Sequence, residues 1–212
     1  MSLTPADVSP ALTRRQRAFK RVCDVLLGSV FLVIAAPVLL SSAVIIRLDS
    51  PGPSFYRQRR VGEGGQEFLM FKLRTMVKDA DRDEEYFIDG QGRSVQFKKQ
   101  SNDPRITRVG KILRRWSLDE LPQLINVIQG DMSLIGPRPE LPPLLERYST
   151  RQRKRFAVPQ GMTGWWQVNG RPQDVAVKVE YDLYYVRNYS AWLDLWILFK
   201  TIGAVLGHRG AI

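Results

Sequence analysis

The segment from Val25 to Ile46 contains no charged residue, whereas charged residues are frequent on either side of it. It is as long as the roughly 20 apolar residues that an α-helix needs to cross the hydrocarbon core of a bilayer. A helix that spans a membrane is therefore one prediction for this segment. Pro37 lies in its middle, where it removes a helix hydrogen bond and bends the chain, and Ser41 and Ser42 follow one turn later, able to bond freed carbonyl groups.

The basic residues around this segment favour a helix that returns to the side from which it enters. Basic flanks of a membrane segment are retained on the cytoplasmic side. We therefore predict a re-entrant, monotopic anchor that is bent at Pro37, with a spanning helix as the alternative. The flanking basic residues are Arg14, Arg15, Arg17, Lys20, Arg21, Arg47, Arg57, Arg59 and Arg60.

The charge balance and the scarcity of cysteine and histidine limit the chemistry that this chain can perform. Lys and Arg number 32 against 21 Asp and Glu, and the net charge of +11 predicts an anionic partner: nucleic acid, anionic lipid or a phosphorylated substrate. The single cysteine, Cys23, excludes an internal disulfide and a multi-cysteine zinc site, and the single histidine, His208, argues against a catalytic triad. A nucleophile or base is therefore expected to be a carboxylate.

The chain after the apolar segment predicts a mixed α/β fold that is mostly helical. Residues 54–60 and 68–76 alternate like two strands joined through the glycine-rich segment 62–65, with Lys72 and Arg74 on one face of the second strand. The other predicted elements are a short charged helix at 78–87, a loop at 88–102, and helices at 103–116, 141–156, 181–186 and 192–206.

Two of these helices are candidates for contact with a membrane surface. The 141–156 helix is amphipathic with a basic polar side, which predicts anionic headgroups as partners. The 192–206 helix carries Trp192 and Trp196 but also Asp194 and Lys200, so it is too short and too charged to span a bilayer. It is expected either to lie in the membrane interface or to be a buried core helix.

Asp119 and Glu120 are adjacent carboxylates at a predicted helix start. A helix that begins near Asp119 places Pro122 in its first turn, where the missing N–H breaks no helix bond. Asp119 is then expected at or near the N-cap. An earlier start through a capping box of Ser117 and Glu120 is the weaker alternative, because it puts Pro122 one residue deeper.

This pair of carboxylates is expected to lie next to a cation, because two adjacent negative charges repel. Arg114, Arg115 and Arg138 are near in sequence, and Mg²⁺ is commonly held by one or two carboxylates plus phosphates. Pro137 and Pro139 stiffen the backbone around Arg138, which suits a guanidinium that clamps a diphosphate. The set predicts phosphoryl transfer. A capped surface helix followed by a rigid linker is the alternative.

Several short motifs occur in order along the chain. They are Lys20-Arg21-x-x-Asp24, Phe71-Lys72-Leu73-Arg74-Thr75-Met76, Ser117-Leu118-Asp119-Glu120-Leu121-Pro122-Gln123, Gly130-Asp131-Met132-Ser133, Gly136-Pro137-Arg138-Pro139, Gly161-x-Thr163-Gly164-Trp165 and Val168-Asn169-Gly170-Arg171. With these motifs the chain resembles the bacterial sugar transferase family, the monotopic polyprenol-phosphate phosphoglycosyl transferases, over nearly its full length. At the predicted bend Ala36-Pro37 replaces the Ser-Pro that is common in this family.

The resemblance implies transfer of a sugar-1-phosphate from a UDP-sugar to undecaprenyl phosphate, with release of UMP. The route expected from the family is covalent: Asp119 attacks the sugar-linked phosphorus, and Glu120 together with Asp119 holds Mg²⁺. The other residues that the resemblance implies are Lys72, Arg114, Arg138 and Arg171 for phosphates, Pro137, Arg138 and Pro139 for the nucleotide, and Asp182 as a further acid of the active site.

The resemblance also implies a place in the cell. Residues 1–49 are expected to form a basic segment and the re-entrant helix, and residues 50–212 a catalytic domain with interfacial C-terminal helices. This domain would lie on the cytosolic face of the bacterial inner membrane, against anionic inner-leaflet lipids, and start the assembly of an exopolysaccharide, capsule, O-antigen or glycoconjugate. The sequence does not decide which sugar is transferred, which pathway is served, or whether the chain forms a homodimer.

Two other functions compete with this one. A basic nucleic-acid-binding protein is expected to be soluble without detergent, and the apolar segment argues against it, so no nucleic acid is expected as a partner. A catalytically inactive membrane adaptor is expected to have lost Asp119, Glu120 or the Pro137-Arg138-Pro139 motif, and all are present.

Overall fold

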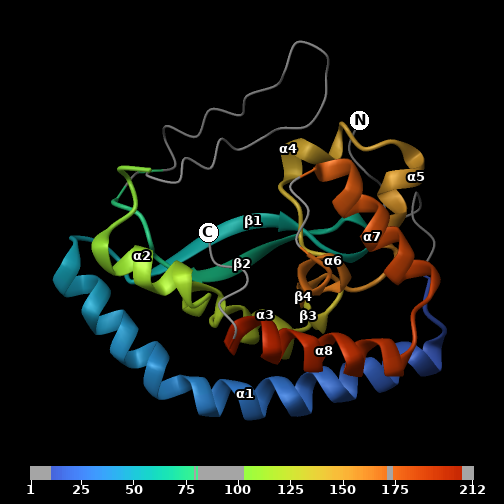
Figure 1. The fold of residues 1–212 in the computed structure, drawn as a ribbon, viewed down its shortest axis with the longest axis horizontal. Coiled ribbons are helices and arrows are strands. Elements are labelled where there is room, and N and C mark those ends of the chain that lie inside the picture. The colour runs from blue at the N-terminus through green and yellow to red at the C-terminus, as the bar shows by residue number, and fades with distance from the viewer. Residues whose placement is uncertain (1–10, 79, 81–102, 171–173, 207–212) are drawn as a thin grey trace.

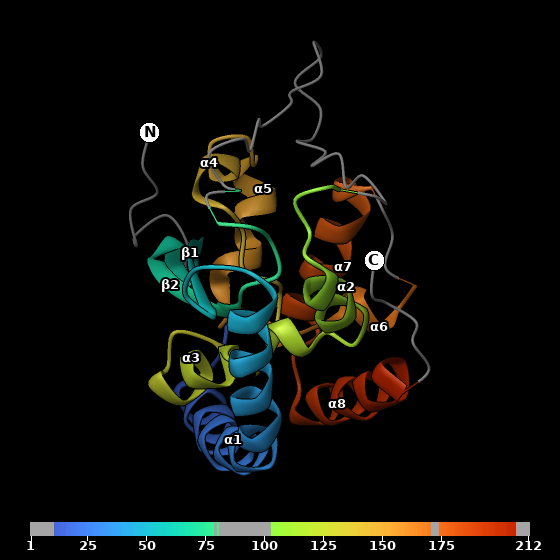
Figure 2. The same cartoon turned by 90° about the vertical axis from the view of Figure 1, so that its left-hand side faces the viewer.

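The computed structural model describes residues 11–78, 80, 103–170 and 174–206. A long N-terminal helix, α1 (Arg14–Asp49), lies along one side of the molecule, and shorter helices and two small sheets lie above it (Figures 1 and 2). The prediction of a mixed, mostly helical α/β fold is confirmed. The loop predicted at 88–102 lies outside the described residues, and so does the short helix predicted at 78–87 except for residues 78 and 80.

The α1 helix is continuous through Pro37 but not straight. It starts with a capping box between Thr13 and Gln16, and the half that ends at Asp49 rises away from the line of the first half (Figure 1). The Ser41 hydroxyl donates to the Pro37 carbonyl over 2.8 Å, a bond to the previous turn that favours bending. By length and composition α1 is apolar enough to cross a membrane, the single helix of the described part that meets this test.

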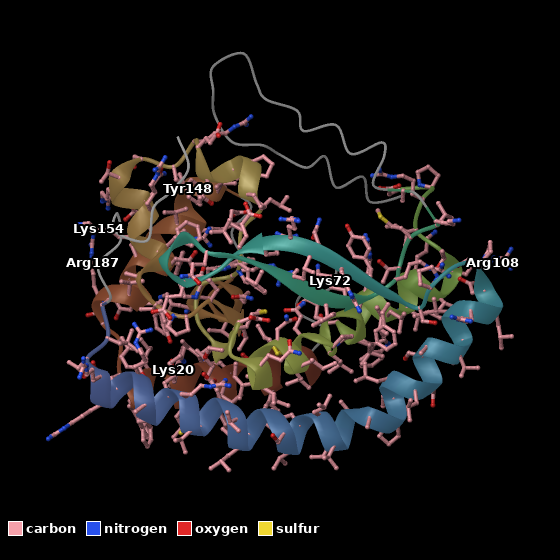
Figure 3. The ribbon with its side chains drawn as sticks, turned by 180° about the vertical axis from the view of Figure 1, so that it is seen from behind. Lys20, Lys72, Arg108, Tyr148, Lys154 and Arg187 are labelled. Carbon is pink, nitrogen blue, oxygen red and sulfur yellow. The ribbon has the colours of Figure 1, made fainter. Side chains whose placement is uncertain are left out.

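One stripe of α1 packs on the rest of the molecule, and three polar residues near its start hold it there. Lys20 Nζ lies 2.6 Å from Asp194 Oδ2, and Figure 3 shows Lys20 on the side of the helix that faces the body. Arg21 donates to two carbonyl groups at the end of helix α3 (Gln123–Gln129), each over 2.6 Å. Asp24 accepts from Ser133 Oγ and from the Leu134 N–H, each over 2.9 Å. The Lys-Arg-x-x-Asp motif therefore docks α1.

The other end of α1 is held by a second buried cation. Arg74 donates to the carbonyl groups of Pro51 and Ser50, each over 2.7 Å, and to Ser50 Oγ over 2.9 Å. Gly52 has a φ of +120°, and a Cβ there would lie 2.2 Å from the Arg74 guanidinium, so only glycine fits. Arg74 therefore does not share a strand face with Lys72 as the alternation predicted; it fixes the exit of α1.

The predicted strand pair is confirmed. Strands β1 (Phe55–Val61) and β2 (Glu67–Leu73) are antiparallel, with Phe55 opposite Leu73 and Val61 opposite Glu67. A 3₁₀ turn at Glu63–Gly65 joins them. The second strand ends at Leu73 rather than at the predicted residue 76, because residues 75–77 pair instead with residues 105–107, where Met76 forms a bridge with Ile106.

Helix α2 (Arg108–Arg115) begins later than predicted. Asp103 is bound by the Arg105 guanidinium, with an Nη2 to Oδ2 distance of 2.8 Å, and residues 104 and 105 form a turn in which the Ile106 N–H donates to the Asp103 carbonyl over 3.1 Å. Thr107 then caps the helix through its hydroxyl, which accepts from the Gly110 N–H over 2.9 Å. A glycine is required at this point of contact, since a Cβ on Gly110 would lie 2.0 Å from the Thr75 carbonyl oxygen.

The prediction of one amphipathic helix over 141–156 is wrong. The segment forms helices α4 (Pro142–Leu145) and α5 (Thr150–Arg153) and a 3₁₀ turn at Lys154–Ala157. A capping box between Ser149 and Gln152 starts the second helix anew, and Arg155 is buried rather than on a solvated face. The remaining elements are the parallel strands β3 (Ser133–Ile135) and β4 (Gly161–Thr163) and helices α6 (Trp165–Val168), α7 (Val175–Arg187) and α8 (Ala191–Leu206).

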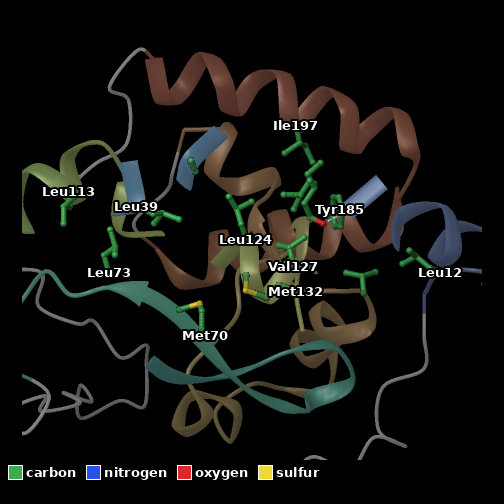
Figure 4. Close-up of a cluster of buried hydrophobic side chains, with 14 of the residues drawn as sticks. Leu12, Leu39, Met70, Leu73, Leu113, Leu124, Val127, Met132, Tyr185 and Ile197 are labelled. Atoms are coloured by element: carbon green, nitrogen blue, oxygen red, sulfur yellow. Dashed lines mark hydrogen bonds between the residues drawn. The ribbon is translucent and has the colours of Figure 1, made fainter. Parts of the chain in front are cut away.

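The main hydrophobic core surrounds α3. Figure 4 shows Leu124 and Val127 of this helix between Met70 of β2 and Ile197 of α8, and Leu39 of α1 packs into the same cluster. Asn126, fully buried on α3, accepts from the Phe71 N–H over 2.9 Å and donates to the Leu69 carbonyl over 2.8 Å. These bonds fix α3 against β2, so the turn before α3 and Lys72 on β2 keep a constant relative position.

Candidate active site

The carboxylate pair lies on a single 3₁₀ turn, Leu118–Glu120, and not at the start of an α-helix. Ser117 has a φ of 54°, the left-handed value, and is the only non-glycine residue in the described ranges with a positive φ. Such a residue costs on the order of 1–3 kcal/mol and marks a place where the fold imposes the conformation. The predicted helix start near Asp119 is therefore wrong, and neither the turn nor α3, which begins at Gln123, has a side-chain cap.

Glu120 is held by the arginine that lies between the two prolines. The Arg138 guanidinium binds it with both nitrogens, Nη2 to Oε1 and Nη1 to Oε2, the second over 3.3 Å. The Glu120 carboxylate raises the pKa of Arg138. This two-pronged pair fixes the plane of the guanidinium over the turn that carries Asp119.

Asp119 shares this site with three of the predicted cations. Burial raises the pKa of its carboxyl group to about 6, the Glu120 charge adds to the rise, and Lys72, Arg114 and Arg138 oppose it. Arg114, the last residue but one of α2, is oriented by a bond of 2.8 Å from its Nε to Thr75 Oγ1. The structure thus brings together five of the predicted residues, whose roles in catalysis stay predictions.

Lys72 is the last residue but one of β2 (Figure 3), and its ammonium group interacts with the charges of Glu120 and Asp119. Burial lowers the pKa of its ammonium group to about 8, Glu120 and Asp119 oppose this, and Arg138 and Arg60 add to it. Sequence reasoning did not single out Arg60 for the site. It shares a face of β1 with Gln58. Its Nη2 donates to Gln58 Oε1 over 2.6 Å, and its Nη1 donates to the Pro139 carbonyl over 3.3 Å.

Each backbone carbonyl group of residues 137–140 accepts a hydrogen bond from another part of the protein. The two prolines bring no N–H that needs a partner, and all four carbonyl groups accept hydrogen bonds. Gly136 packs so closely on the segment before β4 that a Cβ would lie 2.2 Å from the Pro159 carbonyl oxygen. The donors are the Gly161 N–H to Pro137 at 2.8 Å, Arg155 Nη2 to Arg138 at 2.9 Å, Arg60 Nη1 to Pro139 at 3.3 Å and the Val61 N–H to Glu140 at 2.8 Å.

The structure does not place the remaining predicted residues beside Asp119. Asp182 is buried on α7 and binds Arg155, with distances of 3.0 Å and 2.6 Å from Nε and Nη2 to its Oδ2. Burial raises the pKa of Asp182, and Arg155 opposes the rise. Arg171 lies outside the described residues. Sequence reasoning missed Arg155 as a buried residue, although the apolar residues at 156–158 that follow it were a signal.

The donor set of this site fits Mg²⁺. Burial raises the pKa of Asp119 and the Glu120 charge adds to the rise, and a divalent cation would relieve this repulsion. No cluster of three or more Asp, Glu, His or Cys side chains occurs in the part of the chain that the structure describes. Two carboxylates could hold Mg²⁺ together with substrate phosphates, the usual arrangement for this ion.

Comparisons with known proteins indicate the same family as the sequence motifs. The family model of the bacterial sugar transferases matches residues 15–208. A protein of Aeromonas hydrophila named UDP-N-acetylgalactosamine-undecaprenyl-phosphate N-acetylgalactosaminephosphotransferase is 39% identical over 199 residues, which are 91% of this chain and 44% of that protein. The UDP-glucose:undecaprenyl-phosphate glucose-1-phosphate transferase of Escherichia coli (strain K12) is 39% identical over 200 residues, 88% of this chain and 40% of that one.

A third relative is closer in size. The exopolysaccharide production protein ExoY of Rhizobium meliloti (strain 1021) is 42% identical over 198 residues, 91% of this chain and 87% of ExoY. The chain spans less than half the length of the Aeromonas and Escherichia proteins and most of ExoY. The resemblance carried by the motifs is confirmed: this chain belongs to the bacterial sugar transferase family.

Proposed function

We propose that this protein transfers a sugar-1-phosphate from a UDP-sugar to undecaprenyl phosphate and releases UMP. The observation that carries the proposal is Asp119, a carboxylate of raised pKa, on a turn beside Glu120 and opposite three cations. The names of the relatives supply the substrates: undecaprenyl phosphate in both longer proteins, with a UDP-sugar as donor. The ExoY relative supports a role in exopolysaccharide synthesis.

The chemistry that fits this site is a two-step transfer. In the first step a carboxylate oxygen of Asp119 forms a bond to the sugar-linked phosphorus, and the bond from that phosphorus to the bridging oxygen breaks, so that UMP leaves with the electron pair. In the second step a phosphate oxygen of undecaprenyl phosphate forms a bond to the same phosphorus, and Asp119 leaves as a carboxylate. A soluble donor and a lipid acceptor thus use one site in turn.

The cations of the site would act on the phosphates. Lys72, Arg114 and Arg138 surround the turn, so they can bind the diphosphate and stabilise the charge that grows on UMP as it leaves. Arg138 keeps its place because its backbone is fixed from both sides. Mg²⁺ held by Asp119 and Glu120 would add neutralisation of the phosphate charges.

We also propose that α1 is a re-entrant anchor rather than a spanning helix. Lys20, Arg21 and Asp24 tie its first part to the domain, and Arg74 ties its end to the same domain. A helix whose two ends bind one folded domain cannot place them on opposite sides of a bilayer. This supports residues 50–212 on one membrane face, which the basic flanks assign to the cytosol.

The surface beside the anchor fits an inner membrane with anionic lipids. Helix α8 lies next to α1 (Figures 1 and 2) and exposes Trp192, Leu195, Phe199 and Ile202, which share one helix face. The basic residues of α5 lie across the molecule from α1 (Figure 1). Other basic residues, closer to α1, would therefore contact the anionic headgroups. Exposed apolar residues of α1 are Phe19, Val22, Leu26, Leu27, Val30, Val33, Ile34, Val38, Leu40, Val44, Ile45 and Leu48, and exposed basic residues near its ends and on α2 are Arg14, Arg15, Arg47, Arg108, Lys111 and Arg115.

The experiment that tests the transfer omits the acceptor. Detergent-purified protein mixed with a UDP-sugar alone should release up to one UMP per active site and carry a sugar-phosphate on Asp119, seen by intact-protein mass spectrometry after rapid quench. Asp119→Asn should abolish both. Asp174→Asn is the matched control, since Asp174 is an exposed N-cap that asparagine also fills.

Two outcomes would refute the covalent mechanism. One is substantial turnover by Asp119→Asn. The other is turnover by the unaltered protein without any adduct at the earliest times. Either would make Asp119 a metal ligand or a base and replace the two steps by direct displacement in a ternary complex. A panel of UDP-sugars in the same assay identifies the sugar, and the absence of UMP release from every one, with acceptor present, would overturn the proposed function itself.

A further inference from the structure

Arg155 is a buried arginine whose hydrogen-bonding capacity is completely used. A guanidinium has five N–H donors in a fixed plane. Here Nε donates to Asp182 at 3.0 Å, and Nη2 donates to Asp182 at 2.6 Å and to the Arg138 carbonyl at 2.9 Å. Nη1 donates to Glu140 at 3.1 Å and to the Tyr148 hydroxyl at 3.0 Å. Lysine cannot reproduce this set, because it has three donors and no plane.

The partners of Arg155 come from separate parts of the chain. Asp182 lies on α7, Tyr148 lies between α4 and α5, and Glu140 directly follows the 137–139 segment. Tyr148 also donates to Glu140 over 2.8 Å, so the hydroxyl bridges the carboxylate and the guanidinium. The cluster is therefore a junction where α7 meets the segment that carries Arg138.

Stability alone is a poor reason for such a cluster. A buried group of ions often contributes less to stability than apolar residues of the same volume. The second oxygen of Asp182, Oδ1, is buried without a hydrogen-bond partner in the described ranges, which adds to the cost of burial. A device that orients a neighbouring group accounts for the cost better, because it needs directional bonds.

The group that the cluster orients is Arg138. Its carbonyl accepts from Arg155, and its own guanidinium binds Glu120 beside the nucleophile. We infer that Arg155, itself set by Asp182, is a positioning residue that holds Arg138 where it binds the donor diphosphate. The inference rests on the proposed function, and it gives Asp182 a task at a distance from the substrate.

A double-mutant cycle separates positioning from a general structural role. We expect Asp182→Asn to lower kcat/KM for the UDP-sugar by about ten- to a hundredfold, as changes to residues that orient metal ligands do. In an Arg138→Ala background the same change should cost less than about threefold, because the group that it positions is gone. Equal losses in both backgrounds would overturn the inference.

Asp24→Asn is the matched control for this cycle. Asp24 is also a buried acid that accepts two hydrogen bonds, but it binds β3 instead of Arg155. Its loss of kcat/KM, whatever its size, should be the same with and without Arg138. If Asp182→Asn fails to fold, Tyr148→Phe replaces it, since it removes one hydroxyl and keeps both carboxylates.

A measurement without substrate distinguishes this inference from the proposed function. In ¹⁵N spectra of the substrate-free protein, the Nε–H signal of Arg138, assigned by its loss in Arg138→Lys, should shift or broaden in Asp182→Asn and in Tyr148→Phe, and stay in place in Asp24→Asn. An unchanged Arg138 signal while the Arg155 signal moves would overturn the inference. Failure of the proposed function would appear separately, as no UMP release by the unaltered protein.

Discussion

The pKa of Lys72 predicts how the affinity for the donor depends on pH. Burial brings this pKa from an ordinary value of 10.5 to about 8, so the ammonium group is charged at pH 7 and loses its proton as the pH rises past 8. At pH 9 about one Lys72 in ten keeps its charge. If the charged form binds the donor phosphates, kcat/KM for the UDP-sugar falls about tenfold per pH unit above 8. An unburied lysine would not produce this loss until above pH 10.

The assay is UMP release at donor concentrations well below KM, from pH 6.5 to 10. Because kcat/KM reports the free enzyme, its alkaline limb refers to the same substrate-free state as the structure. Lys72→Arg is the matched variant, since a guanidinium stays protonated across this range. We expect it to have lower activity at pH 7 but no fall above pH 8. The same alkaline limb in both proteins would refute the assignment to Lys72.

The lowered pKa of Lys72 also predicts that the stability of the fold rises over the pH range in which activity falls. Between pH 8 and 10.5 the unfolded chain keeps the Lys72 proton and the folded chain does not, so the free energy of unfolding rises with pH through this window. Below pH 8 the buried charge lowers stability. Lys72→Met should therefore raise Tm at pH 7, or leave it unchanged, while it abolishes most of the activity. A fall in Tm would mean that Lys72 stabilises the fold.

Three further outcomes are expected. Glu120→Gln keeps the size of the side chain but removes its charge, so it should weaken the dependence on Mg²⁺ and lower kcat more than about tenfold, which is roughly 1.4 kcal/mol; full activity of the unaltered protein in EDTA would contradict this. Single cysteines at Ser9 and at Ser101, without Cys23, should both resist an impermeant thiol reagent in intact cells, and labelling at Ser9 alone would reveal a spanning helix. Asn126→Leu leaves two groups of β2 unpaired, each at a cost of about 1–3 kcal/mol, so thermal unfolding should occur at a clearly lower temperature, and an unchanged Tm would show that this bond pair is dispensable.

Features that depend on neighbouring residues were predictable from the sequence. The strand pair follows from alternation over 54–60 and a glycine-rich connection, and helix α7 contains the predicted residues 181–186. The grouping of Asp119, Glu120 and Arg138 also followed, because repulsion between two carboxylates demands a cation and the prolines mark a rigid arginine.

Features set by contacts between distant residues were not predictable. From the sequence, Arg155 was predicted to be one of several basic residues on a solvated helix face. Its burial depends on its partner Asp182, which is 27 positions away in the sequence. Arg74 was predicted to lie on a strand face beside Lys72, but it binds the Ser50 carbonyl at the end of α1. In both cases the residue type was visible and its partner was not.

The 3₁₀ turn gives the Asp119 carboxylate a different environment from the helix N-cap that the sequence predicted. At an N-cap its carboxylate would accept a backbone N–H and face the positive end of a helix dipole, and both effects would lower its pKa and occupy an oxygen. The left-handed Ser117 instead ends α2 early and inserts a 3₁₀ turn, so that α3 starts four residues after Asp119. With a pKa of about 6 the carboxyl group is still about nine-tenths ionised at pH 7. Lys72, Arg114 and Arg138 favour this charge. In the proposed mechanism the same cations would bind the donor, so Asp119 and the phosphorus that it attacks would share one electrostatic environment.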